Sequence, residues 1–121
     1  MAEGFSTAAA NAVLDAQVTA YPWFKLHTGA PGANGTANAA TETTRKNPSF
    51  AAASGASKAS STDAAWTNVA GTEDYTHWSQ WSASTAGTFG GSGTVTANAV
   101  TTSDSFTIPA GSIVLTVPVA T

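Results

Sequence analysis

The chain has 121 residues, enough for one domain that buries roughly two-thirds of its unfolded surface. Charged residues make up only 9% of it, the net charge is −3 and no basic cluster is present, so neither nucleic acid nor an anionic membrane is expected as a partner. The absence of cysteine excludes disulfides, thiolate catalysis and cysteine-based zinc sites.

Residues 6–19 are predicted to form a helix, for which Ser6 is a suitable N-cap. Its apolar face recurs at helical spacing and consists of Ala10, Leu14, Val18 and Tyr21. Pro22 ends the helix because proline cannot continue the hydrogen-bond ladder. A short, alanine-rich helix is marginal alone. We therefore expect it to dock on its own sheet or on a neighbouring subunit.

The rest of the chain is predicted to form short strands. In 23–28 the alternation directs Phe24 and Leu26 towards the core. A long loop of turn-forming residues covers 29–41. Further strands are expected around Phe50, around Trp66 and Val69 after a polar loop, and in 75–83 and 87–100.

The last segment is predicted to be a β-hairpin. Phe106 and Ile108 precede a turn at 109–111, where proline and glycine supply the turn dihedrals. The return strand alternates from Ile113 onwards, and Pro118 indicates an edge strand or a strand end.

These elements predict a mainly β fold, an antiparallel β-sandwich of jelly-roll-like type with about seven strands and one short N-terminal helix. Residues 1–21 form the helical segment and 22–121 the sandwich, together making one domain. The predicted core consists of Phe24, Leu26, Phe50, Trp66, Trp81, Phe106, Ile113, Leu115 and Val117.

Two tryptophans stand three residues apart in the 75–83 strand. Trp78 and Trp81 must point to opposite faces, so they form a flat stacking platform for a glycan only if a bulge intervenes. We place Trp81 in the core and Trp78 at a surface covered by the helix or by another subunit. The glycine-rich 90–93 segment favours a bend or bulge, because it lacks the lysine and following helix of a phosphate loop.

No residue pattern predicts a catalytic, cofactor or metal site. His27 and His77 with Glu73 or Asp74 could ligate zinc, but the spacing of known zinc motifs is missing. No serine lies in a nucleophile elbow. No run approaches the ~20 apolar residues of a membrane span, and the acidic N-terminal segment is unlike a signal peptide.

Four segments carry a family resemblance: FKLHTGAPGANGTANA, TRKNPSFAAASG, HWSQWSASTAGTFGGSGTV and FTIPAGSIVLTV, in that order. The ordered set resembles small virion proteins of actinobacterial tailed phages, which are labelled tail fibre, minor tail or head decoration proteins. Ala30 stands where that family usually has aspartate, and Gly90 where it commonly has leucine. Residues 78–80 replace smaller or more apolar residues, which alters one sheet surface.

The resemblance and the low charge imply a non-enzymatic bacteriophage structural protein, an accessory subunit that decorates the capsid or tail lattice. The alternative is a tail-fibre or receptor-binding module for a host surface glycan, which requires a coplanar aromatic pair in an exposed groove.

Expected partners are the phage major capsid or tail protein and further copies of the chain, with a trimer as the expected homo-oligomer. Neither nucleic acid nor membrane is an expected partner, and no cofactor is expected. The expected location is the virion, assembled in the cytoplasm of the host bacterium. The candidate interface residues are Leu14, Val18, Tyr21, Trp78 and Gln80.

Overall fold

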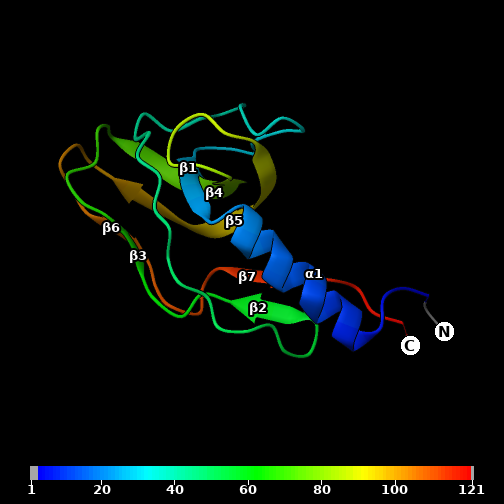
Figure 1. The fold of residues 1–121 in the computed structure, drawn as a ribbon. Coiled ribbons are helices and arrows are strands. Elements are labelled where there is room, and N and C mark those ends of the chain that lie inside the picture. Colours follow the sequence, from blue (N-terminus) through cyan, green and yellow to red (C-terminus); the bar gives the residue numbers. More distant parts are fainter. Residues whose placement is uncertain (1–2, 121) are drawn as a thin grey trace.

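The computed structural model describes residues 3–120, in which one helix and seven strands form an angled body (Figure 1). The elements are α1 (Thr7–Ala20), β1 (Trp23–His27), β2 (Ser57–Ala59), β3 (Ala64–Trp66), β4 (Glu73–Trp81), β5 (Phe89–Val100), β6 (Phe106–Ile108) and β7 (Val114–Thr116). A three-stranded sheet has the order β1-β4-β5, and two-stranded pairs are formed by β2 with β7 and β3 with β6. All pairings between these strands are antiparallel, which confirms the predicted fold class.

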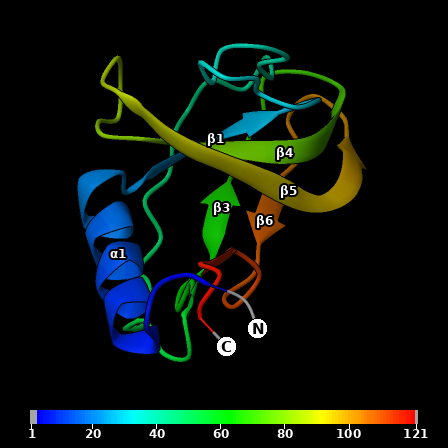
Figure 2. The same cartoon turned by 90° about the vertical axis from the view of Figure 1, so that its right-hand side faces the viewer.

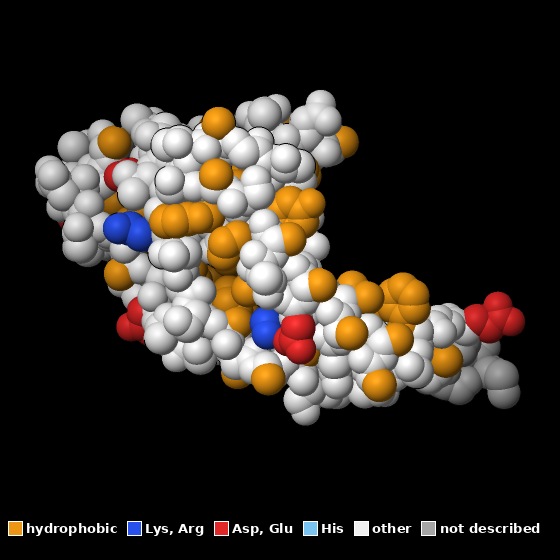
Figure 3. Space-filling view, in the orientation of Figure 1, with side chains coloured by type: hydrophobic (Ala, Val, Ile, Leu, Met, Phe, Trp, Pro, Cys, Tyr) orange, Lys and Arg blue, Asp and Glu red, His pale blue; other side chains and the backbone are white. Residues whose placement is uncertain are grey.

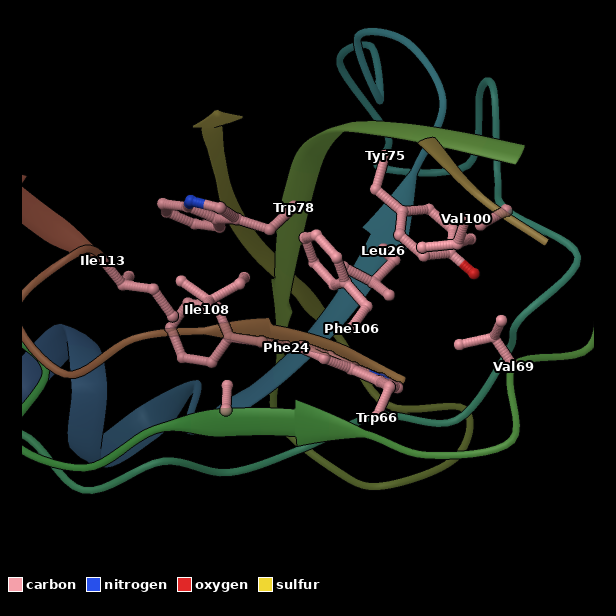
Figure 4. Close-up of a cluster of buried hydrophobic side chains, with 12 residues drawn as sticks. Phe24, Leu26, Trp66, Val69, Tyr75, Trp78, Val100, Phe106, Ile108 and Ile113 are labelled. Carbon is pink, nitrogen blue, oxygen red and sulfur yellow. The ribbon is translucent and has the colours of Figure 1, made fainter. Parts of the chain in front are cut away.

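The main hydrophobic core lies between the three-stranded sheet and the β3–β6 pair (Figure 4). Phe24 of β1 contacts Trp78 of β4 edge-on, with ring centroids 5.1 Å apart. Tyr75 of β4 makes the same kind of contact with Phe106 of β6 at 5.0 Å. Such edge-to-face pairs add to the burial of apolar area. Aromatic packing therefore joins the two layers of a small sandwich.

The helix and the β2–β7 pair form an arm beside the sandwich (Figure 1), and Figure 2 shows α1 to one side of β3 and β6. Ser6 is the N-cap, since its Oγ accepts from the Ala9 N–H at 3.2 Å, and Ala10 and Leu14 are buried. The predicted helix is thus confirmed, displaced by one residue at each end. Lys58 of β2 donates to Asp15 of α1 at 2.6 Å. This bond, helped by one from the Ala53 N–H, lowers the pKa of Asp15 below its ordinary value.

The two tryptophans lie on opposite faces, as predicted, but the assignment of those faces was wrong. Trp78 pairs with Leu26 of β1, and directly paired residues share a face of the sheet, so Trp78 belongs to the main core and is only 3% exposed. Trp81 is buried on the other face, where it contacts Phe89 and the Arg45 guanidinium. The error arose because alternation does not reveal which strand register is formed.

The predicted C-terminal hairpin is also wrong. The turn is present, with the Ser112 N–H donating to the Pro109 carbonyl at 3.0 Å. However, β6 pairs with β3, and β7 pairs with β2, a strand that was predicted to be polar loop. The turn therefore transfers the chain from the sandwich to the arm. The expected strand at Phe50 is reduced to one bridge, to Ser60.

Ile113, which leads into β7, offers a test of the core. Its side chain is 1% exposed, whereas that of the neighbouring Val114 is 47% exposed. Ile113→Ala should lower the free energy of unfolding by about 2–5 kcal/mol, because it leaves a cavity. Val114→Ala should change it by less than about 0.5 kcal/mol. Urea unfolding of both variants measures this, and equal effects would contradict the alternation seen in the structure.

Candidate interface cleft

An uncharged cleft of about 640 Å³ lies between α1, the edge of β5 and β7. The helix contributes Val13, Leu14 and Gln17, β4 contributes Trp78 and Gln80, and the other walls are 91–94, Ser112 and 114–117. None of these residues carries a charge. Val13 and Val114 expose 44% and 47% of their surface. Few charged side chains are seen on the face of the molecule drawn in Figure 3.

A network of carboxamides holds the end of the helix against the sheet beside this cleft. Gln17 of α1 donates through Nε2 to the Gly90 carbonyl at 2.8 Å and to Gln80 Oε1 at 3.3 Å. Gln80 in turn donates to the Tyr21 carbonyl at 3.3 Å, which belongs to the C-cap of the helix. Because Gln80 is 1% exposed, these bonds replace the water that its amide gives up.

The glycines of β5 allow two aromatic rings to lie directly on its backbone. A Cβ at Gly93 would stand 2.3 Å from Cζ2 of Trp78, and one at Gly90 would stand 2.2 Å from Cγ of Tyr21. No residue with a side chain fits at either position unless the ring moves. Gly90 is also the extra residue of a β-bulge, since Gln80 pairs with Gly91 and Trp81 with Phe89. The predicted bulge in the glycine-rich segment is confirmed.

The structure brings three of the five predicted interface residues together. Leu14, Trp78 and Gln80 all line the cleft, although each is itself almost fully buried. Tyr21 is half-buried over Gly90, and Val18 lies beside a separate shallow depression near Pro48 and Phe50.

Sequence reasoning missed the exposed members of the cleft, Val13 and Val114. Val13 is adjacent to the predicted helix face, and Val114 falls on the outward side of the alternation that begins at Ile113. Both are apolar residues at positions that the predicted pattern leaves outside the core, and such residues indicate a contact surface.

The opposite face of the sheet carries a buried series of hydrogen-bonded polar side chains. His27 Nε2 lies 2.7 Å from Ser79 Oγ, which also accepts from Trp81 Nε1 at 2.7 Å. The Ala37 carbonyl can only accept, so His27 Nδ1–H donates to it at 2.9 Å, and Nε2 of the neutral imidazole then accepts from the Ser79 hydroxyl. A serine beside an imidazole is part of a catalytic triad, but both side chains are wholly buried here, so the pair is structural.

The potential metal ligands do not converge in the structure. His27 and His77 pair across β1 and β4, while Glu73 Oε1 accepts from the Thr41 N–H at 2.7 Å. Residues 3–120 contain no group of three histidine or acidic side chains placed to hold an ion.

Burial, followed by the charges of Glu73 and Glu42, raises the pKa of Tyr75 to about 12, so this phenol is neutral at physiological pH.

The comparison with protein families identifies the class of protein. Residues 4–116 match the family described as podophage GP4 fiber I protein gp80. Because this match covers most of the chain, the protein belongs to that family and is a bacteriophage structural protein. No curated protein matches the sequence. None of the helices in the described part of the chain is long and apolar enough to span a membrane.

The contact between Gly93 and Trp78 can be tested by adding one methyl group. Gly93→Ala must displace a buried indole ring, which should destabilise the protein by about 1–3 kcal/mol. Ser92→Ala at the neighbouring exposed position should stay within about 0.5 kcal/mol of the parent protein. Thermal and urea unfolding compare the two variants. A neutral Gly93→Ala would show that the ring does not lie on this backbone.

The buried His27, hydrogen-bonded on the outer face of the sheet, predicts how the stability of the protein depends on pH. Burial lowers the pKa of His27 below 6.5, although its bond to Ala37 opposes this. The unfolded chain thus binds a proton at a higher pH than the folded protein, so stability should fall as the pH drops below 6.5. His27→Gln should be less stable at neutral pH and lose part of this slope. Urea unfolding between about pH 7 and pH 5 measures both slopes, and identical slopes would exclude His27 as the cause.

Proposed function

We propose that the protein is a structural subunit of a fibre on a tailed-phage particle. The observation that carries this proposal is the match of residues 4–116 to a phage fibre family. A fibre subunit acts by contacting neighbouring subunits, and an uncharged cleft with exposed valines is suited to such contacts. The family description favours a fibre over decoration of the capsid.

The role is non-enzymatic in this proposal. The buried Ser79–His27 pair has no access for a substrate, and the carboxylates near Tyr75 bind backbone N–H groups of the chain itself. Glycan binding receives little support, because it would need a coplanar, exposed aromatic pair. Trp66, Trp78 and Trp81 are buried, Trp23 is half-buried, and the Trp81–Phe89 rings are tilted by 54°.

Copies of the chain associate with one another in this proposal, with a trimer as the expected state. The 9% charge content provides little repulsion between copies. A partner at the base of the fibre, a tail or capsid protein, anchors the assembly to the particle.

Labelling of purified phage particles tests where the protein is. Gold-labelled antibodies against the protein should mark fibres, and its copy number by quantitative mass spectrometry should lie far below that of the major capsid protein. An antibody to the capsid protein serves as the control. Label spread over the capsid shell, at a copy number close to that of the shell protein, would overturn the fibre assignment in favour of capsid decoration.

A further inference from the structure

The two edges of the three-stranded sheet differ. The outer edge of β1 is covered by the loop that follows it, since Phe24 and Lys46 exchange two backbone hydrogen bonds of 2.7 and 2.9 Å. Leu26 and Thr28 bind Ala40 and Asn38 of the same loop. In β5, by contrast, 91–96 forms no backbone bridge with any described segment besides β4. This strand therefore presents an open row of N–H and C=O groups.

The open edge also lacks the features that usually prevent strands from pairing with other chains. Soluble proteins protect exposed edges with charge, proline or a covering segment. Between residues 91 and 96, β5 contains glycine, serine, threonine and valine, with no charge and no proline. Register shifts bound the regular part of β5: the bulge at Gly90 lies before it, and a second irregularity falls at residues 95–97, between the Thr94–His77 and Asn98–Tyr75 pairs. The edge is thus free to pair over the regular stretch 91–94, which is shorter than a typical strand of about five to six residues.

This edge forms one wall of the uncharged cleft, and β7 forms the wall across from it. Residues 91–94 and 114–117 both line the cleft, and its exposed apolar surface comes from Val13 and Val114. An extended segment entering here would gain backbone hydrogen bonds from β5 and would cover Val13 and Val114 at the same time. Main-chain bonds combined with side-chain pockets are the usual basis of recognition by strand addition.

We propose that the open edge of β5 binds an extended segment of a second copy of this chain within the cleft. This inference rests on the proposed fibre role and identifies the surface through which the copies associate. The same contact can repeat from copy to copy around a closed ring, which is compatible with a trimer.

The composition of the edge favours another copy over a foreign partner. Ser92, Thr94 and Thr96 are exposed on alternate positions, and Thr and Ser side chains pair favourably across strands, so the edge suits an extended segment rich in serine and threonine, residues that are frequent in this chain. The cleft offers no charge that would select an acidic or a basic partner. A surface that is uncharged in both partners can be buried without desolvating an ion.

Lysines placed in the cleft test the proposal on the purified full-length protein. Thr94→Lys and Val114→Lys each put a charge where the second copy binds, at exposed positions that the fold tolerates. Ala65→Lys, at an exposed position of β3 outside the cleft, is the matched control. Light scattering and sedimentation over a range of concentrations should show self-association that either cleft variant weakens at least about tenfold and the control leaves intact.

Hydrogen exchange then locates the contact. Backbone amides in 91–96 should exchange at least about tenfold more slowly in the wild-type oligomer than in the Val114→Lys monomer, provided that the two proteins have the same melting temperature. Equal exchange would overturn the proposal by showing that the copies meet elsewhere. A wild-type protein that stays monomeric at all concentrations would overturn it too, while gold label on the fibres of phage particles would leave the proposed function standing.

Discussion

The structure depends on the close contact between aromatic rings and glycine backbone in β5. Tyr21 lies on Gly90 and Trp78 on Gly93, so the end of the helix and the centre of β4 both approach a strand that offers no side chain in the way. The carboxamide bonds of Gln17 and Gln80 require this approach, because they span from α1 to the backbone at Gly90. The position of the helix, the burial of Trp78 and the shape of the cleft follow from it.

The sheet separates two different means of stabilisation. On the inner face, Phe24 and Trp78 pack against the β3–β6 pair and contribute through apolar burial. On the outer face, His27 and Ser79 are satisfied by hydrogen bonds, and Arg45 lies over the Trp81 ring at 4.4 Å while donating to the carbonyls of the loop after β4. Arg45, one of only four lysines and arginines in the protein, thus holds the loop after β4 in place.

Local features could be predicted from the sequence, whereas pairing between distant segments could not. The helix with its Ser6 cap and the bulge at Gly90 depend on neighbouring residues, and both were found from the chain alone. The partners of β6 and β7 lie about forty to sixty residues away, and nothing in their own alternation selects them. The face of Trp78 was misassigned for the same reason. The predicted interface brought together Leu14, Trp78 and Gln80, but it omitted Val114, whose exposure is decided by its pairing with β2.

A low charge content has opposite consequences for the two edges of the sheet. Charged side chains are the commonest protection of an exposed strand, and this chain has few to place there. The edge at β1 is protected instead by its own backbone, since the loop from 38 to 46 folds back and binds it. That solution requires a long excursion of chain, and β5 has none, because the chain leaves Val100 for the β3–β6 pair. In a chain of this composition, an edge without a covering loop is left with its hydrogen-bonding groups and its apolar neighbours exposed to water, and the proposed assembly would exchange that water for backbone bonds and apolar contacts from another copy.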